Sequence, residues 1–178
     1  MIKEFALIIS IALLCLLAGC DSERERESGG GSRGGSGGKP IVLIGETLEN
    51  CEVFLGAPSG VDQADLGLRS YIYQGFHIQI IYENGKSRTV VFRKVNTMGA
   101  DSRSFSEADR DFVYQLCGIR SEDLKEVFNA GTGKMEAFTH KKNGQIYLLG
   151  TDINARAIMV MPPPPVSLER IKRELGKR

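Results

Sequence analysis

Two Asn-Gly pairs, Asn84-Gly85 and Asn143-Gly144, constrain the fold of this chain more than any other feature of its sequence. Asn-Gly is the strongest short signal for a β-hairpin, because both residues tolerate the positive φ angles of a tight turn. Ahead of the first pair, the chain alternates between an apolar side and a mixed side, as a half-buried strand does. Strands are therefore predicted on either side of both turns, over residues 76–83, 87–95, 134–141 and 145–151.

An amphipathic helix is predicted ahead of each group of strands. The first, over residues 48–55, follows Thr47 as N-cap and ends at Gly56, with Pro58 preventing its continuation. The second follows the capping-box pair Ser106 and Asp109 and ends at Gly118. Its apolar stripe is expected to consist of Phe112, Val113, Leu116 and Cys117.

The same order of elements is expected twice. Further strands are predicted over residues 68–74 in the first half and 156–161 in the second, and a further short helix over 121–128. The predicted fold class is α+β, with two helix-plus-three-strand meander units, over about residues 45–95 and 105–161. Their helices are expected to pack on an antiparallel sheet.

The first twenty residues carry a targeting signal. An apolar run over residues 5–17 leads into Leu17-Ala18-Gly19-Cys20, which resembles the lipobox of bacterial lipoproteins. The run is 13 residues long, of which 12 are apolar, which suits a signal peptide and is short of the roughly 20 that a membrane-spanning helix needs. The resemblance implies a signal peptide over residues 1–19, cleavage after Gly19, and an N-palmitoyl, S-diacylglycerol cysteine at Cys20.

Residues 20–39 are expected to be a lipidated, disordered tether. They are charged at first and then almost entirely Gly and Ser, a composition that cannot bury enough apolar surface to fold. A flexible chain of this length reaches on the order of 25 Å. The lipidated protein is expected on the cell membrane, facing the periplasm or the outside. By resemblance to Gram-negative sorting rules, Asp21 favours the inner membrane.

The remaining chain, residues 40–161, has roughly the size of one domain. The formal net charge of the whole sequence is +1, so no field favours binding to nucleic acid. Cys15 is expected to leave with the signal peptide, so Cys51 and Cys117 are the cysteines of the folded part. These two could form a disulfide in an oxidising envelope, or each could be a small buried apolar residue near a helix end.

No arrangement of residues in the sequence predicts catalysis, a cofactor or a metal site. His77 and His140 lie in predicted strands without Cys or carboxylate at metal-ligand spacing, so each is interpreted as a partly exposed strand histidine. Residues 131–134 resemble a phosphate-binding loop, but Phe128 replaces its first glycine and Met135 follows the lysine. Several acids are interpreted as solvated loop charges and helix starts: Asp62, Asp65, Asp101, Asp109 and Asp111.

The C-terminal residues 162–178 begin with a polyproline spacer and continue as a short basic helix. Leu168, Ile171 and Leu175 would line one side of this helix, with an excess of Lys and Arg around them. The pattern fits either a contact with anionic lipid or an acidic partner, or a frayed tail that aids solubility.

Several short motifs of the folded part resemble the SmpA/OmlA (BamE-like) family of small lipoproteins. They are Gly45-Glu46-Thr47, the helix end at residues 54–58, the aromatic strand Tyr71-Ile72-Tyr73 and the first Asn-Gly hairpin. Two such units in tandem are similar to the β-lactamase-inhibitor protein fold. The resemblance implies a protein-binding module of envelope assembly.

The sequence thus predicts a membrane-anchored lipoprotein that binds another envelope protein and is not an enzyme. Its contacts would be the bilayer through Cys20 and a protein partner through an exposed sheet face. The alternative is an inhibitor or ligand sensor for an envelope enzyme, in which the loop over residues 57–66 or 97–103 enters the cleft of its partner.

Overall fold

The structure is a computed structural model of the chain, which divides into two units, Met1–Gly37 and Gly38–Arg178. The first unit lies entirely outside the residues that the structure describes. In the second unit the structure describes residues 41–60, 67–95, 104–130, 133–152 and 156–176.

The described residues in the first half of the folded unit form one helix and three strands. Helix α2 (Leu48–Leu55) begins where Thr47 Oγ1 accepts a hydrogen bond from Asn50 N at 3.3 Å. The strands that follow are β1 (Leu68–Tyr73), β2 (Phe76–Glu83) and β3 (Lys86–Lys94). Asn84 and Gly85 join β2 to β3 with φ angles of 53° and 74°, as the Asn-Gly signal predicts.

In the second half, over residues 105–161, the part that the structure describes forms one α-helix and four strands. Helix α3 (Glu107–Cys117) carries the predicted capping box of Ser106 and Asp109 and ends at Gly118. The strands are β4 (Lys125–Ala130), β5 (Gly133–Thr139), β6 (Ile146–Asp152) and β7 (Ala157–Met161).

The short helix predicted over residues 121–128 is wrong. A single 3₁₀ turn, η2 (Ser121–Asp123), is followed directly by β4. Val127 and Phe128 favour extended backbone, and pairing with β5 satisfies the backbone groups of this segment, so tertiary context decides the structure here. The second half therefore has four strands, and the prediction of three strands in each of the two meander units is corrected.

All seven strands form one antiparallel sheet in the order β1-β2-β3-β7-β6-β5-β4. The two halves join where the last strand of each meets, through pairs such as Val90 with Val160 and Phe92 with Ile158. The prediction of an α+β fold with helices on an antiparallel sheet is confirmed at this level.

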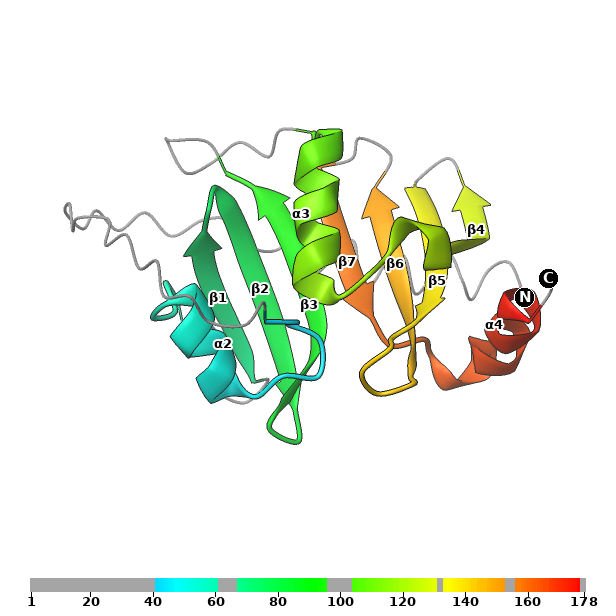
Figure 1. The fold of residues 1–178 in the computed structure, drawn as a ribbon, viewed down its shortest axis with the longest axis horizontal. Helices are drawn as coiled ribbons and strands as arrows, with labels where there is room; N and C mark the ends of the chain where they lie inside the picture. The colour runs from blue at the N-terminus through cyan, green and yellow to red at the C-terminus, as the bar shows by residue number, and fades with distance from the viewer. Residues whose placement is uncertain (1–40, 61–66, 96–103, 131–132, 153–155, 177–178) are drawn as a thin grey trace. The chain divides into compact units, whose positions relative to one another are not determined.

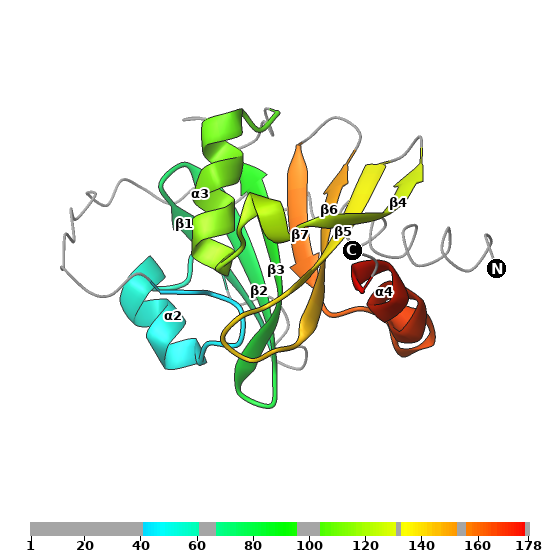
Figure 2. The same ribbon diagram turned by 45° about the vertical axis from the view of Figure 1, so that its right-hand side comes forward.

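Helices α2 and α3 cover the same face of the sheet (Figures 1 and 2). The main core lies beneath them and takes residues from both halves, including Phe92, Phe138 and Leu149. Stacked aromatic rings extend it, with the ring centroids of Phe76 and Phe112 5.3 Å apart.

A third helix, α4 (Leu168–Leu175), follows the 3₁₀ turn η3 (Pro165–Ser167) and lies against β4 and β5. Figure 2 shows it beside β5 and apart from α2 and α3. Within the described residues, no helix combines the length and the apolar character that crossing a bilayer requires.

Candidate functional site

The face of the sheet that points away from α2 and α3 is here called the open face. The strand register places one row of its residues across all seven strands, because directly paired residues point to the same side. In order from β1 to β4, this row is Ser70, Gln79, Val91, Met159, Gly150, Met135 and Phe128.

Burial divides the open face into two ends. At the β5 and β6 end, Met135, Ala137 and Leu148 are buried although they lie outside the main core, and α4 packs there with Ile171 buried as well. At the β1 and β2 end, Ile72 is 55% exposed and Ile81 is 40% exposed. Apolar surface is therefore left in water at the β1 and β2 end.

Polar side chains lie between these two isoleucines. His77 is the register partner of Ile72 on one side and of Arg93 on the other. Arg93 Nη1 donates a hydrogen bond to Gln79 Oε1 at 3.1 Å, which links two neighbouring strands on the same face. Apolar contact and hydrogen bonding are thus available side by side, as on protein-binding surfaces.

The sequence contained a signal for part of this site. The alternation in β2 places Ile81 on the same side as His77 and Gln79, so an apolar residue stands among polar ones on the side expected to face water. The exposure of Ile72 had no such signal, because it depends on β1 being an edge strand of the sheet.

The two cysteines of the folded part are free and buried. Cys51 lies in α2 and Cys117 at the end of α3, and both belong to the main buried core between the helices and the sheet. Burial raises the pKa of both thiols, which keeps them protonated and unreactive at neutral pH.

The two histidines lie in different surroundings. His77 is half-buried on the open face, as a partly exposed strand residue should be. His140 is only 2% exposed, so its interpretation as a partly exposed strand histidine is wrong. It follows β5, where Asn143 and Tyr147 enclose its ring.

The other candidate residues do not come together. Asp109 serves the capping box of α3 and pairs with Lys94, whose Nζ lies 2.6 Å from Asp109 Oδ2, while Asp111 is exposed on the same helix. Lys134 lies in β5 and pairs with Glu136 at 2.8 Å. The described residues contain no group of three or more His, Cys, Asp or Glu side chains that could hold a metal ion.

Several sequence predictions fall outside the described residues. These are Cys20 and the whole tether, Asp62, Asp65, Asp101, and most of the two loops considered for an inhibitor. The basic tail is partly described, and in it α4 uses Ile171 to pack on the sheet.

Comparison with known proteins does not assign the chain to a family. No protein-family model matches the chain, and no curated protein sequence matches it. Two solved structures are similar to it. One is a cysteine-rich secretory protein from Staphylococcus aureus, with 9% identity and a TM-score of 0.32. The other is an extracellular protein containing an SCP domain from Bacillus anthracis, with 12% identity and a TM-score of 0.33.

The alignments cover 67% and 85% of this chain but only 44% and 59% of those structures. At TM-scores below 0.5, neither structure indicates the fold or the function of this chain. The resemblance to the SmpA/OmlA (BamE-like) family and to the tandem β-lactamase-inhibitor fold is wrong. No protein-family model, of that family or of any other, matches the chain. The motif misled because a capping Thr47, a terminating Gly56 and a following Pro58 are what many short helices require.

Proposed function

We propose that the protein is a membrane-anchored bacterial lipoprotein whose folded part binds another envelope protein, without catalysis. The anchor is Cys20, lipidated after cleavage behind Gly19, and residues 20–39 are the flexible tether. The folded part then lies on the extracytoplasmic side, and Asp21 favours retention in the inner membrane. Tethering raises the effective concentration of the binding surface near the membrane.

The observation that carries the binding proposal is the exposure of Ile72 and Ile81 on the open face. Their register positions lie four residues apart along paired strands, or about 13 Å at the rise of a β-strand. Two apolar anchors at this separation, with His77 and Gln79 between them, suit an apolar segment of a protein partner that also forms hydrogen bonds.

The proposal is tested by site-specific photocrosslinking in cells that produce the lipidated protein. The photoreactive group is placed at Ile72, at Ile81, or at Val53, which is 81% exposed on α2 and serves as the control. We expect the same discrete crosslinked protein from the two open-face positions and not from Val53. Ile72→Asp together with Ile81→Asp should abolish it while leaving the melting temperature within a few degrees.

Two outcomes contradict the proposal. Equal crosslinking from Val53 would mean that the open face is not the binding surface. A ligand-dependent rise in melting temperature without any crosslinked protein would favour the ligand-sensor alternative. The anchor is tested in a separate experiment. The protein should incorporate an alkyne-labelled fatty acid, and Cys20→Ser should lose this labelling.

A further inference from the structure

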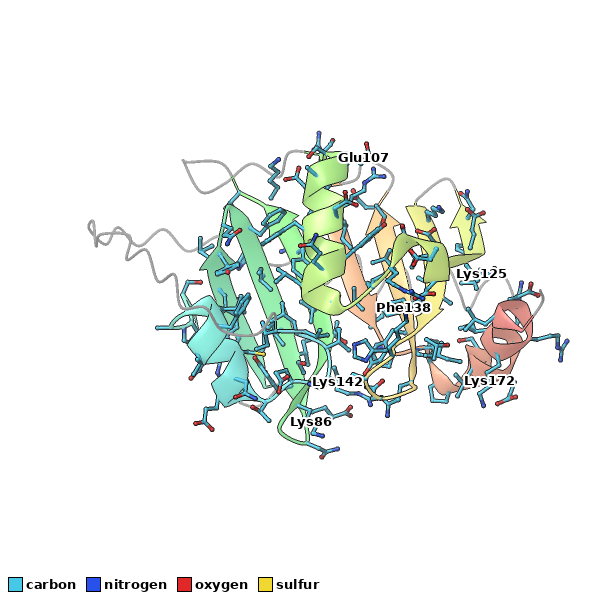
Figure 3. The ribbon with its side chains drawn as sticks, viewed as in Figure 1. Lys86, Glu107, Lys125, Phe138, Lys142 and Lys172 are labelled. Carbon is cyan, nitrogen blue, oxygen red and sulfur yellow. The ribbon has the colours of Figure 1, made fainter. Side chains whose placement is uncertain are left out.

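Three segments that are distant in the sequence meet at one end of the sheet and are here called the joint. They are residues 41–47 ahead of α2, residues 116–118 at the end of α3, and residues 140–147 around the β5–β6 turn. Leu43 N donates to Leu116 O at 2.7 Å, and Lys142 Nζ to Glu46 Oε2 at 2.8 Å. Figure 3 shows Lys142 in the turn that extends toward the segment preceding α2.

The segment over residues 41–47 is also bound to the first half of the sheet. Ser87 Oγ accepts a hydrogen bond from Glu46 N at 3.1 Å and donates one to Leu43 O. Leu43 and Ile44 are fully buried. The joint thus fixes the point where the expected tether enters the folded unit.

His140 lies at the centre of the joint and is bound through its backbone and its ring. His140 N donates to Gln145 O, and His140 O accepts from Gly144 N, each at 2.8 Å. The imidazole meets the Tyr147 ring edge-on, with centroids 5.8 Å apart.

The hydrogen bonds of Asn143 determine which ring nitrogen of His140 carries the proton. Asn143 Oδ1 accepts from Gln145 N at 3.0 Å, and Asn143 Nδ2 donates to the Tyr147 hydroxyl at 3.3 Å, so the oxygen faces His140. His140 Nδ1 lies 3.2 Å from this oxygen and must donate to it. The neutral ring therefore carries its proton on Nδ1, and a second proton would have to bind Nε2.

Nε2 lies close to Gly118 at the end of α3 and to Val42 of the entering segment. A Cβ atom built on Gly118 would lie 3.3 Å from Nε2 and 3.0 Å from Val42 Cγ1, so backbone and an apolar side chain fill this space. None of the hydrogen bonds within the described residues reaches Nε2. A proton there would put a positive charge on a ring that is only 2% exposed, which is costly.

The charged and titratable groups around the joint do not offset this cost. From the turn, the ammonium of Lys142 acts on the imidazole, and its own partner is Glu46 of the entering segment. Lys141 pairs with Asp123 at 3.7 Å. The buried thiol of Cys117 belongs to α3. The hydroxyl of Tyr147 belongs to β6 and donates a hydrogen bond to Gln145 Oε1.

We propose that His140 makes the joint acid-sensitive, so that protonation of its imidazole opens the contacts that hold residues 41–47 to the folded unit. The device responds to the pH of the compartment and does not depend on the partner proposed above. Opening would lengthen the proposed tether by up to seven residues, or roughly 20 Å.

The direction of the effect follows from the pKa of His140. Burial lowers this pKa from its ordinary value of 6.5, and Lys142 lowers it further, while the hydrogen bond with Asn143 opposes both. When the joint is open, His140 regains its ordinary pKa, so the open state binds more protons below about pH 6.5. The closed joint is therefore fully stable above about pH 7 and loses stability as the pH falls below 6.5.

Hydrogen exchange of the full-length protein at pH 7.5 and 5.5, corrected for intrinsic exchange rates, tests the proposal. We expect opening of peptides over residues 41–47 and 140–147 to increase up to about tenfold at the lower pH. His140→Gln should remove this increase, since glutamine does not titrate. His77→Gln is the matched control, because His77 is the other histidine of the sequence and lies outside the joint. In this variant, exchange over residues 41–47 and 140–147 should respond to pH as it does in the unmodified protein.

Two results would overturn the proposal. One is the same acid response in His140→Gln, and the other is an increase spread evenly over β2 and β3, which would indicate general destabilisation. If His140→Gln does not fold, an NMR titration of the unmodified protein decides the question. Titration of the His140 ring near pH 6.5, with unchanged amide signals over residues 41–47, would also reject the proposal.

Discussion

At the scale of single residues, two glycines with the same backbone conformation have different surroundings. Gly118 and Gly144 adopt φ angles of 64° and 66°, in the left-handed region that side chains disfavour. A Cβ on Gly144 would meet nothing within 4 Å, whereas one on Gly118 would meet Val42 and His140. The requirement at Gly118 is therefore both conformational and steric.

Comparing Gly118→Ala with Gly144→Ala should separate these two contributions. Both substitutions should cost about 1–2 kcal/mol for the left-handed conformation. Gly118→Ala should cost a further 1–3 kcal/mol or so, because Val42 and His140 have to move. Urea denaturation measures the difference, and equal losses for the two variants would show that the joint tolerates the added methyl group.

At the scale of elements, α4 shows how a basic amphipathic pattern is used. Leu168 and Leu175 are half-buried and Ile171 is buried against the sheet, while Lys172 pairs with Glu169 at 2.7 Å in solvent. A helix that uses its apolar side for intramolecular packing does not offer that side to a bilayer. By packing against β4 and β5, α4 covers that end of the open face and leaves the β1 and β2 end exposed.

Ile171→Ala should therefore destabilise the folded protein by about 2–4 kcal/mol, because it leaves a cavity between α4 and the sheet. Val53→Ala removes the same kind of side chain from the solvent side of α2 and should change stability by less than about 0.5 kcal/mol. Chemical denaturation of both variants gives the comparison. A loss as small for Ile171→Ala as for Val53→Ala would mean that α4 is frayed in solution.

At the scale of the whole folded unit, the pairing of β3 with β7 makes one sheet from two similar halves. The main core crosses this junction, since Phe92 of β3, Ile158 of β7 and Phe138 of β5 belong to the same buried cluster. Neither half can unfold without exposing the apolar residues of the other.

Thermal unfolding should accordingly be a single cooperative transition. The chain lacks tryptophan, so tyrosine fluorescence reports on side-chain packing and far-UV circular dichroism on the backbone. The midpoints measured by the two probes should agree within about 1–2 °C if no intermediate is populated. Two separate transitions would show that the halves fold independently despite sharing a sheet.

The sequence by itself determined the local features of this protein. The Asn84-Gly85 turn, the caps at Thr47 and Ser106, and the helix end at Gly118 depend on φ angles and on hydrogen bonds between near neighbours. The second Asn-Gly pair marks a turn between strands, but only Gly144 has a positive φ and the loop spans residues 140–145. These interactions are encoded within a few residues, so the strands on either side of both turns and the two main helices could be predicted.

Only the tertiary structure decided the features that depend on distant partners. Residues 125–130 form a strand because β5 pairs with them, and the burial of His140 requires Gly118 and Asn143 around one ring. The exposure of Ile72 depends on β1 being an edge strand of the sheet, at the end that α4 does not cover. Such outcomes follow from the free energy of packing segments far apart in the chain, which no local pattern contains.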